Sequence, residues 1–236
     1  MIRRIDVALR TELAAAPVDR STALFEAAMM ARCAASPTQI SGRGRASTQA
    51  LAAVGERAEP GVLIEFTSAS AARRYVAAVA PLIPEAEVRG HQLGWRHQYE
   101  VHQVTVPSRL EPLVSNRLRR AWQSAAEVLA DERRVPAAKR QAVARAAWRA
   151  ALLVVGPGRG VACLRLRLAD LPAVDVLLRA AVVLELPAQA GRRPGGYVVS
   201  VDGPDVVRRL LDEAGCISQL PVAPSLQAAA AIPTPA

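Results

Sequence analysis

Aromatic side chains are scarce in this sequence: phenylalanine, tryptophan and tyrosine make up 3% of its 236 residues. Lysine is nearly absent, since Lys139 is the only one and arginine carries almost all of the positive charge. The hydrophobic fraction is nevertheless 51%, so we expect a core built mainly of alanine, valine and leucine. This length allows one large domain or two small ones with a substantial core.

Metal-binding patterns are missing as well. Cys33, Cys163 and Cys216 lie far apart, with no CxxC pair and no histidine at a ligand spacing from any of them. We therefore predict free thiols in a reducing compartment, and neither a metal nor a cofactor. The N-terminal segment has no apolar core for a signal peptide, which predicts a cytoplasmic protein without a membrane partner. No motif indicates a small-molecule substrate.

Positive charge exceeds negative charge by a wide margin. The formal net charge is +9 and the isoelectric point is about 10.8. A GC-rich genome would account for arginine in place of lysine and for the many alanines, but not for the net excess. The excess favours a polyanionic partner, with nucleic acid first and a membrane surface second.

The rest of the chain is arranged around a helix that we expect at residues 142–156. Its small and apolar residues recur at steps of three and four, which is typical of an amphipathic helix with a face that a second helix can approach closely. Arg145 and Arg149 lie on another face, and Gly156-Pro157-Gly158 ends the helix. The uncharged run is too short to cross a bilayer.

Periodicity predicts the other elements. Further helices are expected at residues 2–15, 20–35 with Asp19 as N-cap, 69–82 with Thr67 or Ser68 as cap, 172–186, and 204–214 closed by Gly215. Another helix is expected at residues 108–130, with Leu110, Leu113, Leu118 and Trp122 as its apolar side. Strands are expected at residues 62–66, 87–96, 98–106, 162–168 and 197–201, with 187–193 as a basic strand or turn and 39–47 as a strand or a loose basic ribbon. Residues 221–236 are expected to be disordered.

Both halves of the chain show the same order: helix, strand, helix, strand, strand, helix. This order indicates a duplicated α+β unit. We divide the chain into a first half at residues 1–130, a connector at 131–139, a second half at 140–220 and a tail at 221–236.

The second half resembles the WhiA family of sporulation regulators. That family shows a helix ending in a glycine-rich turn, a strand, a helix ending in "LG-hydrophobic-Pro-Ala", a charged Arg-Gly hairpin, and a closing helix ending in "LLxxxGA". The corresponding pieces here are residues 146–156, 163–168, 184–190, 192–201 and 210–216. The first half is similar through the segments ELAAAP, AAMMARCAA and TSASAARRYVAAVAPL.

This resemblance implies a degenerate LAGLIDADG homing-endonuclease-like domain. Its α+β fold would place two central helices, residues 20–35 and 142–156, against each other, with two curved antiparallel sheets forming a saddle over DNA. Family members also carry a C-terminal helix-turn-helix, to which no segment of this sequence corresponds. We therefore do not expect DNA recognition through such a domain.

The acids of an active homing endonuclease are absent. Such an enzyme needs a carboxylate at the C-terminal end of each central helix, because the two together hold the metal ions. Here those ends read Cys33-Ala34-Ala35-Ser36 and Val154-Val155-Gly156, while Glu26 comes too early and Asp170 lies beyond the next strand. We predict no catalytic residue, no metal site and no enzyme activity.

The strand at residues 162–168 carries the candidate DNA contacts. If Leu164, Leu166 and Leu168 face the core, Arg165 and Arg167 share the opposite face. That face would be the concave one in a LAGLIDADG-like saddle. Arg192 and Arg193 on the next hairpin would extend it, and Arg43 and Arg45 would be the first-half counterparts; for the latter pair, a flexible solvated turn is an equal alternative.

Two functions stay open on the sequence alone. One is a non-catalytic, WhiA-like regulator of transcription that contacts the DNA backbone through arginines. The other is a protein-interaction module that binds, or competes with, a full-length regulator or another transcription partner. A solvated arginine face in an arginine-rich proteome is the alternative to any DNA contact.

Overall fold

The two halves of the chain repeat one order of helices and strands, as the sequence predicted. A computed structural model describes residues 2–34, 60–93, 99–156 and 163–216. After α1 (Ile2–Ala15), the first half contains α2 (Ala23–Ala34), β1 (Pro60–Phe66), α4 (Ala69–Val79), β2 (Glu87–Leu93), β3 (Tyr99–Pro107), the short η1 (Ser108–Leu110) and α5 (Glu111–Ala130). The second half contains α6 (Ala137–Val155), β4 (Cys163–Leu168), α7 (Leu171–Val183), β5 (Gln189–Arg193), β6 (Gly196–Asp202) and α8 (Pro204–Ala214).

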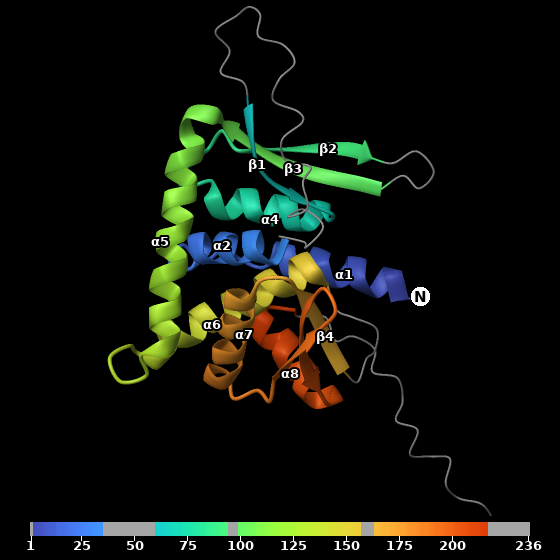
Figure 1. Cartoon of the computed structure of the whole chain (residues 1–236), viewed down its shortest axis with the longest axis vertical. Coiled ribbons are helices and arrows are strands. Elements are labelled where there is room, and N and C mark those ends of the chain that lie inside the picture. Colours follow the sequence, from blue (N-terminus) through green and yellow to red (C-terminus); the bar gives the residue numbers. More distant parts are fainter. Residues whose placement is uncertain (1, 35–59, 94–98, 157–162, 217–236) are drawn as a thin grey trace, which may run out of the picture.

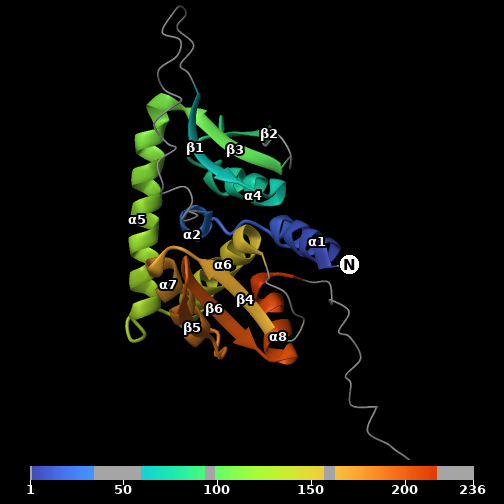
Figure 2. The ribbon, with the colours of Figure 1, turned by 45° about the vertical axis from the view of Figure 1, so that its right-hand side comes forward.

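The strands form two three-stranded antiparallel sheets with the same internal order. The first sheet runs β1-β3-β2 and the second runs β4-β6-β5, so the last strand of each half lies in the middle of its sheet. Figure 2 shows the two sheets on either side of the central helices. The predicted α+β fold with two antiparallel sheets is confirmed.

α2 and α6 pack against each other in the middle of the molecule (Figure 1). Met29 and Met30 of α2 and Ala147 and Ala150 of α6 are all 0% exposed. Small side chains on the buried face of α6 allow a second helix to approach its backbone closely. The predicted pair of central helices is confirmed, and one continuous hydrophobic core joins the two halves.

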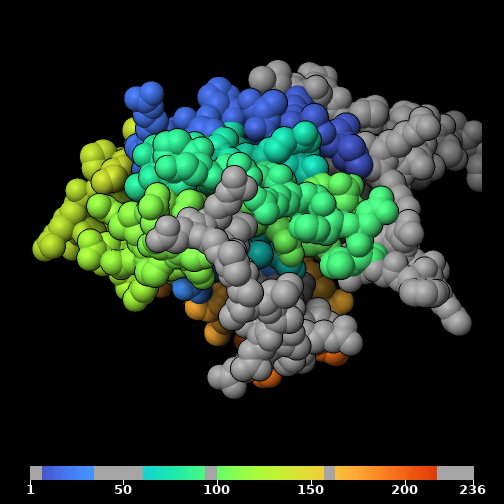
Figure 3. Space-filling view, turned by 90° about the horizontal axis from the view of Figure 1, so that it is seen from above, coloured from blue at the N-terminus to red at the C-terminus, as the bar shows by residue number. Residues whose placement is uncertain are grey.

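α1 and α5 flank this centre. α1 packs on α4 and α6, whereas α5 packs on α2 and α7, so each flanking helix contacts both halves. Figure 1 shows α5 running alongside both halves, and Figure 3 shows α1, α4 and the first sheet as neighbouring parts of one surface. Leu9 and Leu13, one turn apart on α1, are 2% and 0% exposed.

Several element boundaries differ from those predicted. α2 begins at Ala23 because the Asp19 carboxylate accepts the N–H of Ser21 at 2.9 Å and closes a separate turn before the helix. α6 begins directly after Pro136 rather than at residue 142. The inner side of α5 begins at Val114, whereas Leu113, which its apolar character predicted to face inward, is 46% exposed.

Two capping predictions are confirmed. The Ser68 hydroxyl accepts the N–H of Ala71 at the start of α4. Gly215 closes α8 with φ 96°, a conformation that favours glycine. Gly195, with φ 80°, lies in the turn between β5 and β6, and Gly196, with φ 143°, is the first residue of β6. The predicted basic ribbon at residues 39–47, Pro157 and Gly158 of the predicted helix stop, and the tail at 221–236 lie outside the described residues. None of the described helices combines the length and apolarity that a membrane span requires.

Candidate nucleic-acid interface

β4 places two arginines on one exposed face of the second sheet. Leu164, Leu166 and Leu168 are 3%, 0% and 2% exposed, while Arg165 and Arg167 between them are exposed. Burying one leucine side chain is worth about 1.5–3 kcal/mol, and a slip by one residue would expose all three. The leucines therefore fix the direction of the arginines, as predicted.

Strand register shows which hairpin arginine joins them. Arg167 lies opposite Val198 of β6, and Val198 lies opposite Gly191 of β5. Residues directly opposite share a face and neighbours along a strand alternate, so Arg193 shares the face of Arg165 and Arg167. We call Arg165, Arg167 and Arg193 the arginine face.

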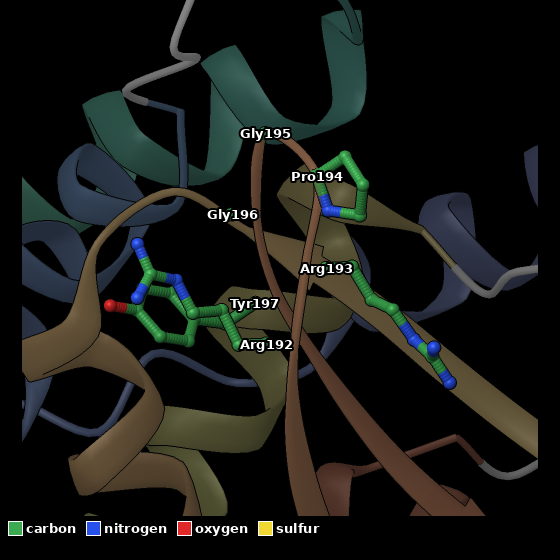
Figure 4. A pocket seen from close by; sticks show the side chains of 6 residues that line it. All are labelled: Arg192, Arg193, Pro194, Gly195, Gly196 and Tyr197. Carbon is green, nitrogen blue, oxygen red and sulfur yellow. The ribbon is translucent and has the colours of Figure 1, made fainter.

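Arg192 belongs to the other side of the sheet. It lies opposite Tyr197, which lies opposite the buried Leu168. Figure 4 shows the side chains of Arg192 and Tyr197 together on one side of the hairpin and that of Arg193 on the other. The structure thus separates the two arginines that the sequence analysis grouped, because side chains alternate along a strand.

The hairpin turn is held in a single geometry. A Cβ atom on Gly196 would come 2.4 Å from the backbone oxygen of Leu168, so only glycine fits there. A guanidinium nitrogen of Arg167 donates to the Pro194 carbonyl at 2.5 Å. Residues 192–197 line a shallow hollow of about 600 Å³ (Figure 4). Arg167 therefore supports the turn as well as adding charge to the arginine face.

The outer face of the first sheet has a different chemistry. Gln103 of β3 donates to the carboxylate of Glu65 on β1 at 2.7 Å, and Arg89 lies 3.5 Å from Glu87 on β2. These strands carry more acidic than basic groups on that face, so their charge does not match that of the arginine face. Arg43 and Arg45, the predicted first-half counterparts, lie outside the described residues.

The Asp170 carboxylate lies near the C-terminal end of α2, although it is far from that helix in the sequence. Asp170 begins α7 by accepting the N–H of Ala173, and it also accepts a 2.8 Å hydrogen bond from Arg32. The Arg32 guanidinium lies 4.2 Å from the centre of the Trp122 ring on α5. Burial, and then the negative charge of Asp170, raise the pKa of the Cys33 thiol above its ordinary value.

At the end of α6, an arginine meets the free carbonyl groups. Arg10 of α1 donates to the carbonyl oxygens of Leu153, Val154 and Val155 at 3.2, 3.3 and 3.4 Å. A cation at this position complements the negative end of the helix dipole. Sequence analysis missed Arg10 and Arg32, because no local pattern links them to helix ends far away in the chain. Within the described ranges, no group of three or more potential metal-binding side chains comes together.

Solved structures match this arrangement, although no protein-family model and no curated protein matches the sequence. The N-terminal LAGLIDADG domain of DUF199/WhiA matches with a TM-score of 0.57 and 11% identity, over 92% of this chain and 93% of that chain. Full-length DUF199/WhiA from Thermotoga maritima matches with a TM-score of 0.56 and 11% identity, over 89% of this chain. The match covers 61% of that protein, so this chain spans less than two thirds of its length.

A third structure, I-DmoI in complex with DNA and Mn, has a TM-score of 0.42 and 14% identity, over 84% of this chain and 99% of that chain. The two WhiA structures confirm, at the level of the fold, the resemblance seen in the sequence: this chain has a WhiA-like LAGLIDADG fold.

Proposed function

We propose that this protein is a non-catalytic, DNA-associated regulator of transcription that contacts the DNA backbone through the arginine face. The observation that carries the proposal is the exposure of Arg165 and Arg167 on one side of β4, fixed by three buried leucines on the other. Guanidinium groups bind phosphates well, and contacts to phosphate alone position a protein without reading sequence. The likeness to WhiA supports a regulatory role for a chain with this fold.

The ends of the central helices support a role without catalysis. Arg10 occupies the carbonyl end of α6, and Arg32 pairs with Asp170, a carboxylate that approaches the end of α2. A guanidinium at each position repels a divalent cation and takes up the oxygen atoms that would bind it. A positive charge at the end of α6 and a neutralised carboxylate at the end of α2 both oppose the metal binding that hydrolysis would need.

The test is the affinity for duplex DNA as a function of salt concentration. We expect weak binding that falls steeply with salt, and Arg165→Ala/Arg193→Ala should flatten the slope by up to about two units on every sequence tested. Arg167 is left intact because it supports the hairpin turn. The control is Arg73→Ala/Arg192→Ala, which removes the same charge from exposed positions off the arginine face.

The control pair should leave the slope close to that of the wild type. Absence of wild-type binding at low salt would refute the proposal. Equal flattening by both pairs would show that net charge, and not the arginine face, accounts for the binding.

A further inference from the structure

A second positively charged surface lies on the outer side of α5. Arg117 and Arg120 are exposed there, and the chain has no acidic residue between Glu111 and Glu127. Leu113 and Ser124 lie four residues before Arg117 and four after Arg120, so all four follow the spacing of one helix face. We call Leu113, Arg117, Arg120 and Ser124 the α5 stripe.

The fold does not neutralise the charge of this stripe. Some arginines elsewhere have an acidic partner: Arg74 pairs with Glu26 at 2.7 Å and Arg145 with Glu213 at 2.6 Å. Within the described part of the chain, neither Arg117 nor Arg120 has a side-chain hydrogen bond or an ion pair. Their charge is therefore available to a partner.

The α5 stripe and the arginine face point to different sides of the molecule. α5 packs on α7, and α7 packs on β4 and β6 from the leucine side of the second sheet. The arginine face is the other side of that sheet. Figure 1 and Figure 2 both show α5 along the flank, away from the strands of the second sheet. One surface therefore does not extend the other.

We propose that the α5 stripe docks an acidic segment of a partner protein, with carboxylates over Arg117 and Arg120 and an apolar side chain over Leu113. The exposed leucine favours a peptide over nucleic acid: at 46% exposure it offers apolar surface that a phosphate backbone leaves uncovered. The stripe spans about 16 Å along the helix at 1.5 Å per residue, which suits a few turns of an amphipathic segment.

The test compares two probes on matched variants. The probes are a short fluorescent peptide with glutamate and leucine at helical spacing, and a mixed-sequence DNA duplex. The stripe variant is Arg117→Glu/Arg120→Glu, and the control is Arg133→Glu/Arg134→Glu, an equal charge change at exposed residues just beyond α5. All four positions are on the surface, so thermal unfolding should confirm that both variants fold.

We expect the stripe variant to bind the peptide about tenfold more weakly than the wild type, and the control less than about twofold. Leu113→Ala should weaken binding of the peptide but leave the affinity for DNA unchanged. Equal losses of peptide affinity in the stripe and control variants, or no peptide binding by the wild type, would overturn the proposal. So would a larger loss of DNA affinity in the stripe variant than in the control, which would make α5 a DNA contact. Arg165→Ala/Arg193→Ala should leave peptide binding unchanged. Failure of the α5 stripe proposal can therefore be distinguished from failure of the proposed function.

Discussion

Glu26 and Arg74 form a two-point ion pair inside the protein. The Arg74 Nε and Nη2 atoms lie 2.7 and 3.1 Å from the two carboxylate oxygens of Glu26, and each side chain is 1% exposed. Arg149 of α6 lies 3.8 Å from the same carboxylate, and Arg74 also donates to the carbonyls of Ala16 and Pro17. The Glu26 carboxylate on α2 thus contacts arginines of α4 and α6. Through Arg74 it is also linked to the segment that follows α1.

Glu26→Ala should lower the free energy of unfolding by about 3–5 kcal/mol, because it leaves Arg74 buried without its counter-charge. Urea denaturation measures the loss. The control is Glu87→Ala, which breaks an exposed pair and should cost no more than about 1 kcal/mol. Similar losses of stability in Glu26→Ala and Glu87→Ala would mean that the buried ion pair matters no more than an exposed one. Glu26→Leu/Arg74→Leu should recover much of the stability, since it removes both buried charges.

Ala150→Phe should destabilise the protein by about 1–3 kcal/mol, because Ala150 is 0% exposed on α6, the helix that packs against α2. Thermal unfolding is the measurement. Ala138→Phe, at an exposed position near the start of the same helix, should change the melting temperature little. An unchanged melting temperature for Ala150→Phe would mean that the central helices do not pack as described.

The buried thiol of Cys33 should make stability fall with rising pH. Its pKa is raised in the folded protein, chiefly by burial, whereas in the unfolded chain the thiol ionises near pH 8.5. Above that pH the unfolded state loses a proton that the folded state keeps, so the free energy of unfolding falls by about 1.4 kcal/mol per pH unit. Denaturation measured from pH 7 to 10 should show a shallower fall in the free energy of unfolding for Cys33→Ala than for the wild type. Parallel curves for the two proteins would show that Cys33 does not cause this pH dependence.

The protein should not cut DNA. Incubation of supercoiled plasmid with the purified protein and Mg²⁺ or Mn²⁺ should leave it intact, because Arg10 and Arg32 hold the ends of the central helices. The sharpest contrary result would be metal-dependent nicking that Asp170→Asn abolishes. Asp170 is the carboxylate that the fold brings to the end of α2, so that outcome would make it a metal ligand.

The sequence predicted the local elements well wherever a single repeating pattern controlled them. α1 and α8 have the predicted bounds, and the alternation of leucine and arginine on β4 predicted both its burial and its exposed face. Predictions failed where side chains compete locally, as at Asp19, whose carboxylate closes a turn and delays the start of α2. They also failed at Leu113, whose apolar character does not decide its direction on α5.

By itself, then, the sequence determined the helices, most strands, their order in two similar halves, and the absence of acidic residues from the last turns of the central helices themselves. These properties depend on residue type and short spacings, which the linear chain displays directly. Only the tertiary structure decided that Asp170 meets Arg32, that Arg10 closes α6, and that Arg193 and Arg192 face opposite ways. Such pairs depend on strand register and helix packing between residues far apart in the chain, where burial of the core selects the partners and no local pattern records them.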